Sequence, residues 1–264
     1  MTSLYRQNPG DTEATVTTYD SARPAMEGDG GFWPADRRLL AVMPLHAITS
    51  LHGEQGLRER LHIEIAQFPA ADRTRIGSAL KLMSLAHARD RRQREPYANH
   101  PLRVTIRILS HYRVTDPGIA CAALLHDVVE DHAENISPDG TRQGALDMLG
   151  RHFGERTAQV VAAVTNPVWE SGRDKHEQYR EHVAASLAVS PWARVVKVSD
   201  FTDNAVGLFH TTGPKVPDLA RKYRPLVPVL RELILRPDTP LQPGAKDIIV
   251  RQLGKADARF NSLD

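Results

Sequence analysis

Apolar residues recur every three or four positions through most of the chain, which is the period of an α-helix with one buried face. Between residues 56 and 68 they fall at Leu57, Leu61 and Ile65, and from Asp72, read as an N-cap, a second periodic run extends to about residue 89. The same period predicts helices over residues 99–111, 117–132, 141–151, 154–165, 173–189, 192–209 and 216–235. No stretch alternates clearly enough to be a strand, so the predicted fold is all-α, a compact multi-helix bundle.

The hydrophobic pattern divides the chain into three regions. Residues 1–55 are predicted to form a partly irregular N-terminal extension, because the first 35 are rich in Thr, Gly, Asp and Pro. Residues 56–235 carry the helical period and are predicted to form the functional domain. Residues 236–264 include the amphipathic run KDIIVRQL, which is predicted to pack back on that domain.

Composition narrows the class of protein. The 264 residues are 41% hydrophobic and 25% charged, which is ordinary for a globular protein. The net charge of +2 provides no global field toward nucleic acid or an acidic membrane, so neither is an expected partner. The single cysteine, Cys121, fits a reducing compartment, and no secretory leader or membrane-length apolar run is visible. A cytoplasmic location is therefore expected. The sequence does not determine whether the chain forms a homo-oligomer.

The candidate chemistry centres on residues 122–132, AALLHDVVEDH. His126, Asp127, Glu130 and Asp131 fall within six positions and, on one continuous helix, would share one half of its surface. The other half is apolar and predicted to be buried, and buried charges need a metal or charged partners. Imidazole and carboxylate together suit Mn, Fe, Zn or Co. The competing interpretation is a surface helix with a salt-bridged acidic edge.

Two further segments could complete a metal site. His100 lies at the start of a predicted helix in YANHPLRV, and Asp200 lies in the mostly apolar run RVVKVSDFTDN. With His126 and Asp127 they would form a set of two imidazoles and two carboxylates that leaves positions for water or substrate. Such an open site acidifies bound water near neutral pH.

A family resemblance joins these segments. YANHPL, LLHDVVED and KVSDFTDN, in this order, together with FGERTAQVVAAVTN, resemble the HD-type hydrolase domain of the RelA/SpoT enzymes over about residues 72–235. The small alarmone hydrolases, including the metazoan SpoT homologue, share this domain. The resemblance implies an HD-domain helical bundle, one Mn(II) ion and removal of the 3′-pyrophosphate of ppGpp or pppGpp to give GDP or GTP. The chain leaves no room for a synthetase segment, so a hydrolase-only member is expected.

The resemblance also implies roles for individual residues. The implied metal ligands are His100, His126, Asp127 and Asp200, with Glu130 and Asp131 activating water and assisting the leaving group. The substrate contacts implied or suggested by residue chemistry are Arg91 and Arg92 for phosphates, Lys197 as a weaker phosphate candidate, Asn204 for the nucleoside and Tyr223 as a residue closing over it.

The chain departs from the family pattern around the expected nucleoside site. Where the family commonly has Asp-Arg-x-His-Asn, this chain has Asp200-Phe201-Thr202-Asp203-Asn204, and Gly207 replaces a common Thr. The Arg-rich loop before PYxxHP is also shorter. Because these changes lie where the base and ribose would bind, the adenine alarmone ppApp is also a candidate substrate. Two other functions remain as alternatives: a wider HD-superfamily phosphohydrolase acting on other (deoxy)nucleotides, and a non-catalytic alarmone-binding protein.

The remaining histidines carry no expected chemistry. His46, His52 and His62 have no ordinary metal-site spacing. Seven others are expected to be packing or surface residues: His87, His111, His132, His152, His176, His182 and His210.

Overall fold

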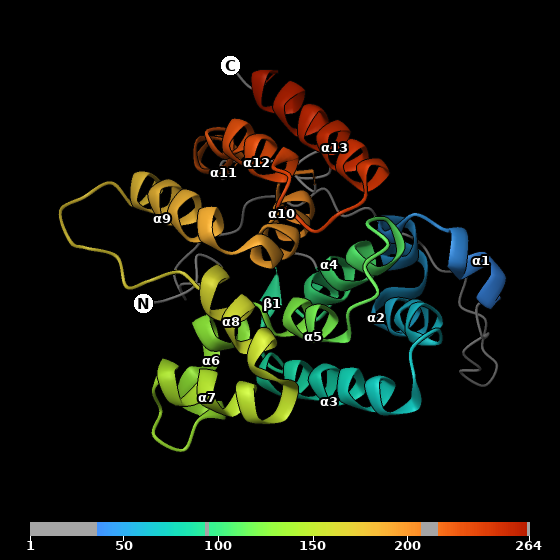
Figure 1. Ribbon diagram of the computed structural model, residues 1–264. Helices are drawn as coiled ribbons and strands as arrows, with labels where there is room; N and C mark the ends of the chain where they lie inside the picture. Colours follow the sequence, from blue (N-terminus) through green and yellow to red (C-terminus); the bar gives the residue numbers. More distant parts are fainter. Residues whose placement is uncertain (1–35, 93–94, 207–215, 263–264) are drawn as a thin grey trace, which may run out of the picture.

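Helices account for nearly all regular structure in the computed structural model, which describes residues 36–92, 95–206 and 216–262 (Figure 1). The helices are α1 (Arg37–Val42), α2 (Leu45–Ile65), α3 (Ala70–Ala86), α4 (Asn99–Ser110), α5 (Pro117–Leu125), α6 (Val128–Ile136), α7 (Arg142–Phe153), α8 (Glu155–Val164), α9 (Lys175–Val189), α10 (Pro191–Val206), α11 (Val216–Tyr223), α12 (Leu226–Leu235) and α13 (Pro243–Asn261). Two antiparallel two-residue strands, β1 (Arg91–Arg92) and β2 (Glu95–Pro96), connect α3 to α4. The all-α prediction is confirmed.

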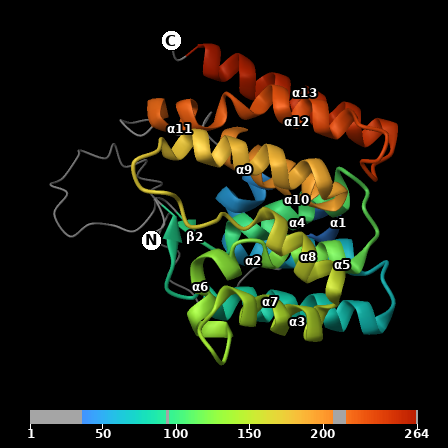
Figure 2. The same cartoon turned by 60° about the vertical axis from the view of Figure 1, so that its left-hand side comes forward.

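Two helices in the middle of the stack organise the core. In Figure 2, α3 and α7 lie below, α4, α5 and α8 lie in the middle, and α12 and α13 lie above. Helix α4 packs against α2, α5 and α10, while α5 packs against α3, α4 and α8. Every residue of α5 from Gly118 to Leu125 is buried. A helix that is apolar all round must lie inside the protein, which fixes the end of α5 deep in the fold.

The segment 117–132 is not the one continuous helix that was predicted. Helix α5 ends at Leu125, His126 and Asp127 form a turn, and α6 begins at Val128. The apolar residues on either side, Val128 included, are buried as expected. The four ionisable residues therefore do not form one stripe along a helix; the first two occupy a buried turn between helices.

Three other local predictions differ from the structure. Helix α3 follows Pro69, and Asp72 lies in its first turn, paired with Arg75 instead of capping the helix. The predicted helix over residues 216–235 is divided into α11 and α12 at Arg224–Pro225, since proline removes a backbone donor. The Arg-rich loop before PYxxHP, where no strand was predicted, contains the β1–β2 pair.

The helices near the two ends of the chain can be compared with the predicted boundaries of the three regions. Helix α2 runs through position 55, where the first boundary was placed, and residues 1–35 lie outside the described part. Helix α13 extends well beyond KDIIVRQL and packs on α10 and α12. Within the described ranges no helix combines the length and apolarity that crossing a membrane requires.

Gly154 joins α7 to α8 in a conformation that favours glycine, with φ of 96°. A Cβ there would meet no atom within 4 Å, so Gly154→Ala tests backbone conformation alone. We expect it to lower the free energy of unfolding by about 1–2 kcal/mol in urea melts. The control is Gly244→Ala in the exposed first turn of α13, where φ is not positive and space is open. It should be neutral or slightly stabilising; equal losses from both variants would contradict the argument.

Candidate metal centre

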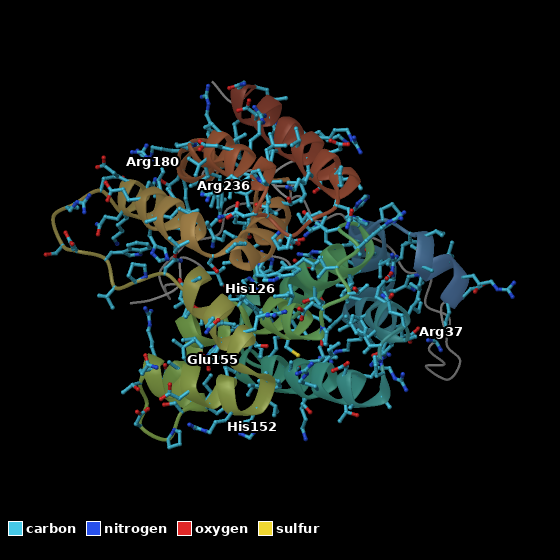
Figure 3. All side chains as sticks on the ribbon, viewed as in Figure 1. Arg37, His126, His152, Glu155, Arg180 and Arg236 are labelled. Atoms are coloured by element: carbon cyan, nitrogen blue, oxygen red, sulfur yellow. The ribbon has the colours of Figure 1, made fainter. Side chains whose placement is uncertain are left out.

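The turn between α5 and α6 presents a histidine and an aspartate to the same interior point. His126 Nδ1 lies 2.8 Å from the carbonyl oxygen of Ala123, which it can reach as a donor, so its Nε2 faces away from the backbone. His126 lies in the interior of the fold (Figure 3) and is 2% exposed, and its Nε2 has no hydrogen-bond partner among the described residues. A buried nitrogen without a partner is costly unless a ligand completes it. The neighbouring Asp127 is partly buried beside it.

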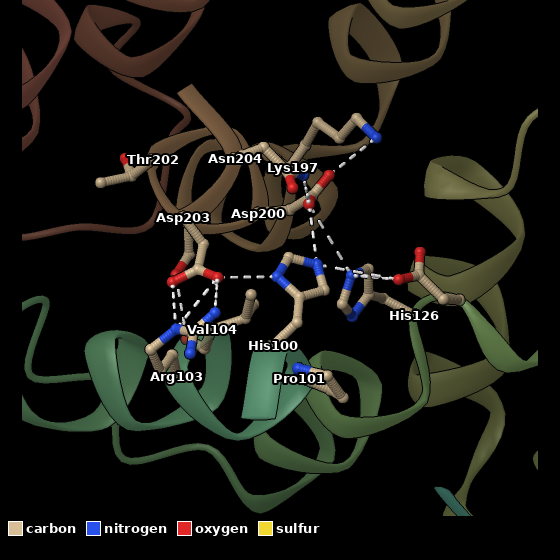
Figure 4. Close-up of polar contacts among 12 residues, drawn as sticks. His100, Pro101, Arg103, Val104, His126, Lys197, Asp200, Thr202, Asp203 and Asn204 are labelled. Atoms are coloured by element: carbon tan, nitrogen blue, oxygen red, sulfur yellow. Dashed lines mark hydrogen bonds and ion pairs between the residues drawn. The ribbon is translucent and has the colours of Figure 1, made fainter. Parts of the chain in front are cut away.

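A second imidazole reaches the same point from α4. His100 is fully buried, its Nδ1 lies 2.8 Å from Asp203 Oδ2, and its Nε2 also lacks a hydrogen-bond partner in the described ranges. The Nε2 atom lies 3.2 Å from Asp200 Oδ1 on α10, an approach drawn in Figure 4. In both histidines one nitrogen is tied to the protein and the other points inward, which is the arrangement of metal-binding imidazoles.

The two carboxylates complete the constellation. Asp127 Oδ2 lies 3.2 Å from His126 Nε2 and 3.7 Å from His100 Nε2, and Asp200 Oδ1 lies 3.9 Å from His126 Nε2. The ligand atoms of His100, His126 and Asp200 all lie within 4.8 Å of one another. Two imidazoles and two carboxylates at these separations can hold a borderline divalent cation. The structure thus brings together the four residues that the sequence analysis joined only through a family resemblance.

The electrostatics of the cluster also suit a cation. Burial opposes a charge on His126, but the Asp127 carboxylate, together with Asp200 and the carbonyl of Ala123, outweighs it and raises the pKa of the imidazole to about 9. Burial likewise opposes the Asp200 carboxylate, yet Lys197, followed by the two histidines, lowers its pKa below the usual value. The two carboxylates therefore favour positive charge at the centre. A bound cation would supply that charge while both imidazoles stay unprotonated.

The orientation of His100 depends on Asp203, whose role the sequence analysis did not identify. Asp203 Oδ2 lies 2.8 Å from His100 Nδ1, and both carboxylate oxygens accept hydrogen bonds from Arg103 and one from Arg107. Figure 4 shows this carboxylate on the side of the ring away from Asp200. Asp203 lies three residues after Asp200 in the place where the family pattern differs. The residue that departs from the family pattern therefore holds a candidate metal ligand, His100, in its orientation.

Tyr97 supports the other carboxylate. Its hydroxyl donates to Asp127 Oδ2 at 2.6 Å and lies 3.4 Å from Asp131 Oδ2. Burial and the nearby Asp127 raise the pKa of the phenol well above its usual value, so it stays a donor. Its position in PYxxHP, three residues before His100, is the signal that could have identified it.

Replacing the Tyr97 hydroxyl should weaken metal binding. Removal of a group that orients a ligand typically costs a factor of about 10–100 in metal affinity, and we expect a loss in this range for Tyr97→Phe. Competition with a chelator measures it. Tyr112→Phe is the matched control, because this buried tyrosine donates to Gln252 instead. Unchanged affinity in Tyr97→Phe would contradict the assignment.

The two candidate catalytic carboxylates lie in different surroundings. Glu130 accepts hydrogen bonds from the backbone N–H of Asn166 at 3.0 Å and from its side-chain amide at 2.9 Å. Asp131 is partly buried near Asp127, Glu130 and Asp90, and burial followed by these charges raises its pKa to about 8. Asn166 ends the run FGERTAQVVAAVTN, so the family resemblance is the sequence signal that points to it.

Two of the predicted substrate contacts meet beside the centre. Asn204 donates to Asp200 Oδ1 at 2.6 Å and accepts from Arg92 at 3.0 Å. The Arg92 guanidinium also lies 5.2 Å from the centre of the Tyr97 ring. The contacts link the β1 strand to α10 at the edge of the candidate centre.

The other predicted substrate contacts are placed differently. Lys197 is buried and donates to Asp200 Oδ2 at 3.0 Å, so its ammonium is already engaged within the protein. Arg91 is exposed on β1. Tyr223 is buried and packs edge-on against Phe201, with ring centres 5.7 Å apart. Gly207 lies outside the described residues.

The chain is similar in sequence to several curated proteins. Three curated relatives are guanosine-3′,5′-bis(diphosphate) 3′-pyrophosphohydrolases. MESH1 of Mus musculus is 39% identical over 106 residues, which are 40% of this chain and 51% of the relative. MESH1 of Xenopus tropicalis is 32% identical over 135 residues, 50% of this chain and 68% of the relative. The enzyme of Aquifex aeolicus is 30% identical over 184 residues, 66% of this chain and 24% of the relative.

The chain belongs to the MESH1 family. The match to the frog protein carries this assignment, because it combines 32% identity with more than two thirds of that relative's length. The chain spans about half the length of the mouse MESH1 protein. A solved structure of a metazoan orthologue of SpoT that hydrolyses ppGpp shares the fold, with a TM-score of 0.54 at 23% identity over 72% of this chain and 97% of that one. No known family profile matches the chain.

Proposed function

We propose that this chain is a metal-dependent hydrolase of alarmone nucleotides, which converts ppGpp or pppGpp to GDP or GTP and pyrophosphate. The observation that carries the proposal is the meeting of two buried, otherwise unpartnered imidazole nitrogens with two carboxylates from three separate segments. Membership of the MESH1 family supplies the substrate class, because its curated relatives are named 3′-pyrophosphohydrolases. The proposed substrate is a small molecule.

The proposed cofactor is one Mn(II) ion held by His100, His126, Asp127 and Asp200. These nitrogen and carboxylate donors suit Mn(II) among the divalent transition metals, and their inward-facing Nε2 atoms fit a bound ion. Such an ion would lower the pKa of a bound water and offset the negative charge of the phosphate under attack. Lys197 and Asn204 both bond to Asp200, so they would hold this ligand in one orientation.

The proposed reaction assigns the proton transfers to Glu130 and Asp131. Water adds to the phosphorus next to the ribose 3′ oxygen, and the bond between that phosphorus and the oxygen breaks. Glu130, fixed by Asn166, would accept a proton from the attacking water, and Asp131 would give one to the departing ribose oxygen. Both lie in the first turn of α6, immediately after the metal-binding turn.

The substrate phosphates are proposed to meet the basic edge formed by β1. Arg92 is placed there by Tyr97 and Asn204, and Arg91 extends from the same strand into solvent. Guanidinium groups pair with phosphate oxygens in two-point contacts. An alarmone carries two phosphate clusters that such groups can bind. Tyr223 is proposed to support the nucleoside side of the site through Phe201.

A product assay tests the proposal. The full chain is loaded with Mn(II) and incubated separately with ppGpp, ppApp and dGTP, and the released anion is identified. Pyrophosphate from ppGpp supports the proposed function; pyrophosphate from ppApp alone would locate the difference in the changed region around Asp203. Orthophosphate from dGTP without alarmone turnover would overturn it in favour of a wider nucleotide phosphohydrolase. Tight ppGpp binding without any product would instead indicate a binding protein.

A further inference from the structure

A second group of metal-binding side chains lies at the other side of Tyr97. Among the described residues, two groups of three His and Asp side chains bring their ligand atoms within 4.8 Å; one belongs to the centre above, and the other is His87, Asp90 and His132. His87 ends α3, Asp90 follows it in the turn before β1, and His132 lies in α6. The sequence analysis treated both histidines as packing or surface residues.

The three ligand atoms converge closely. Asp90 Oδ2 lies 2.8 Å from His87 Nδ1 and 2.6 Å from His132 Nε2, and the two nitrogens are 3.1 Å apart. The imidazole planes are nearly perpendicular, at 77°. Helix α6 is kinked at His132, whose φ and ψ are −140° and 24°. Two imidazole nitrogens and one carboxylate oxygen therefore share one small space.

While Asp90 is ionised, no arrangement of protons makes all three of these contacts hydrogen bonds. If both nitrogens carry hydrogen and donate to Asp90 Oδ2, the 3.1 Å contact brings two donors together with no acceptor between them. If either nitrogen lacks hydrogen, its lone pair faces the Asp90 carboxylate instead. A cation accepts electron pairs from all three atoms at once and removes the conflict. Burial lowers the pKa of His87. Burial alone would raise the pKa of the Asp90 carboxyl, but hydrogen bonds with the two histidines lower it. These are the neutral imidazole and the carboxylate that bind metals.

We propose that His87, Asp90 and His132 form a second metal site, which takes a borderline divalent cation of the Zn²⁺ and Co²⁺ class. Two imidazoles and one carboxylate are a donor set for such ions, with the remaining positions filled by water. Bonds of about 2.0–2.1 Å to a tetrahedral ion place ligand atoms about 3.3 Å apart, so the three atoms must separate by a few tenths of an ångström. Asp90 can move, because its side chain is 34% exposed and lies in a turn.

The second site is separate from the first but adjoins it. The ring of His87 stacks on Tyr97, with centres 4.3 Å apart and planes 16° from parallel, while the Tyr97 hydroxyl donates to Asp127. No ligand is shared between the two groups. An ion held by His87 and Asp90 on one side and His132 on the other would cross-link the end of α3 to α6. Helix α6 also carries Glu130 and Asp131, so the second ion would fix the helix that presents them.

Metal counting tests the proposal without reference to activity. Metal-free full-length protein is saturated with Zn²⁺, passed through a desalting column and analysed for zinc per chain. We expect two ions in the parent protein, one in His132→Gln, one in Asp90→Asn and two in the control His152→Gln, whose imidazole is exposed on α7. His126→Ala should hold one ion by losing the other site. The double variant His126→Ala/His132→Gln should hold none.

A Co²⁺ titration provides the second readout. The second equivalent should give a visible d–d absorption band that is absent from His132→Gln and Asp90→Asn, and saturation of the parent protein should raise its Tm more than that of either variant. One ion per chain in the parent protein, lost in His126→Ala and kept in His132→Gln, would overturn the proposal. Circular dichroism confirms folding; both substituted side chains are partly exposed, so at least one variant should fold. Because the readouts are ion counts and spectra, failure of alarmone hydrolysis would leave this test unaffected.

Discussion

Asp127→Ala should abolish hydrolysis, with kcat/KM reduced by about 10³-fold or more, and should remove the bound Mn(II) at the same time. Asp127 Oδ2 is the carboxylate oxygen within 3.7 Å of both inward-facing imidazole nitrogens. Without it, the ion loses a charged ligand and the Tyr97 hydroxyl loses its acceptor. The effects on affinity and turnover therefore arise from the same missing atom.

The measurement pairs metal content with the rate of pyrophosphate release over a range of ppGpp concentrations, which gives kcat/KM. Asp147→Ala, in which an exposed aspartate of α7 is removed, should match the parent protein in both. Asp127→Asn preserves the shape of the side chain and should also lose most activity, because the negative charge is what the cation requires. Normal turnover by a metal-free Asp127→Ala protein would disprove the metal-dependent mechanism.

The fold class and most helices follow from the sequence because the 3.6-residue period is strong and uninterrupted there. The turn at His126 and Asp127 could not be predicted in this way. The run AALLHDVVEDH contains neither Gly nor Pro, so local preferences favour one helix through it. Packing produces the turn instead: α5 is surrounded by α3, α4 and α8, whereas α6 lies against α3 and α7.

The candidate site, like the fold, can be predicted only in part from the sequence. The sequence supplied His126 and Asp127 from one short run, but His100 and Asp200 were joined to them only by the family resemblance, since no spacing rule connects three distant segments. Asp203 was noticed as a departure from the family pattern, yet its contact with His100 depends on how α10 crosses α4. The meeting of His87 with His132 depends in the same way on tertiary packing, because 45 residues separate them.

Asp203→Ala should destabilise the metal-free protein by about 3–5 kcal/mol, the range expected when one partner of a buried ion pair is removed. The Asp203 side chain is 4% exposed and pairs with Arg103 at 2.9 Å and Arg107 at 3.0 Å. Arg103 would keep Glu95 as a partner, and Arg107 would keep the carbonyl oxygen of Ser199. Both guanidinium groups nevertheless stay largely buried, with less negative charge to balance them.

Urea unfolding of the metal-free protein at neutral pH measures this effect apart from any contribution of a bound ion. Asp218→Ala is the control: Asp218 pairs with Arg221 on the surface of α11, where both side chains are about half exposed or more, and its loss should cost less than about 1 kcal/mol. A loss of comparable size in Asp203→Ala would mean that the buried network adds no more than a surface pair.

Metal affinity separates the two roles of Asp203. Asp203→Asn can still accept a hydrogen bond, so it should recover part of the lost stability while giving up the negative charge opposite His100 Nδ1. A carboxylate in that position fixes the ring and strengthens the donor at Nε2, and its removal typically weakens metal binding by about 10–100-fold. We therefore expect Asp203→Asn to remain folded, to bind Mn(II) within this reduced range, and to lose activity that added Mn(II) partly restores. Full parent affinity in a folded Asp203→Asn protein would show that Asp203 stabilises the helices without orienting the ligand.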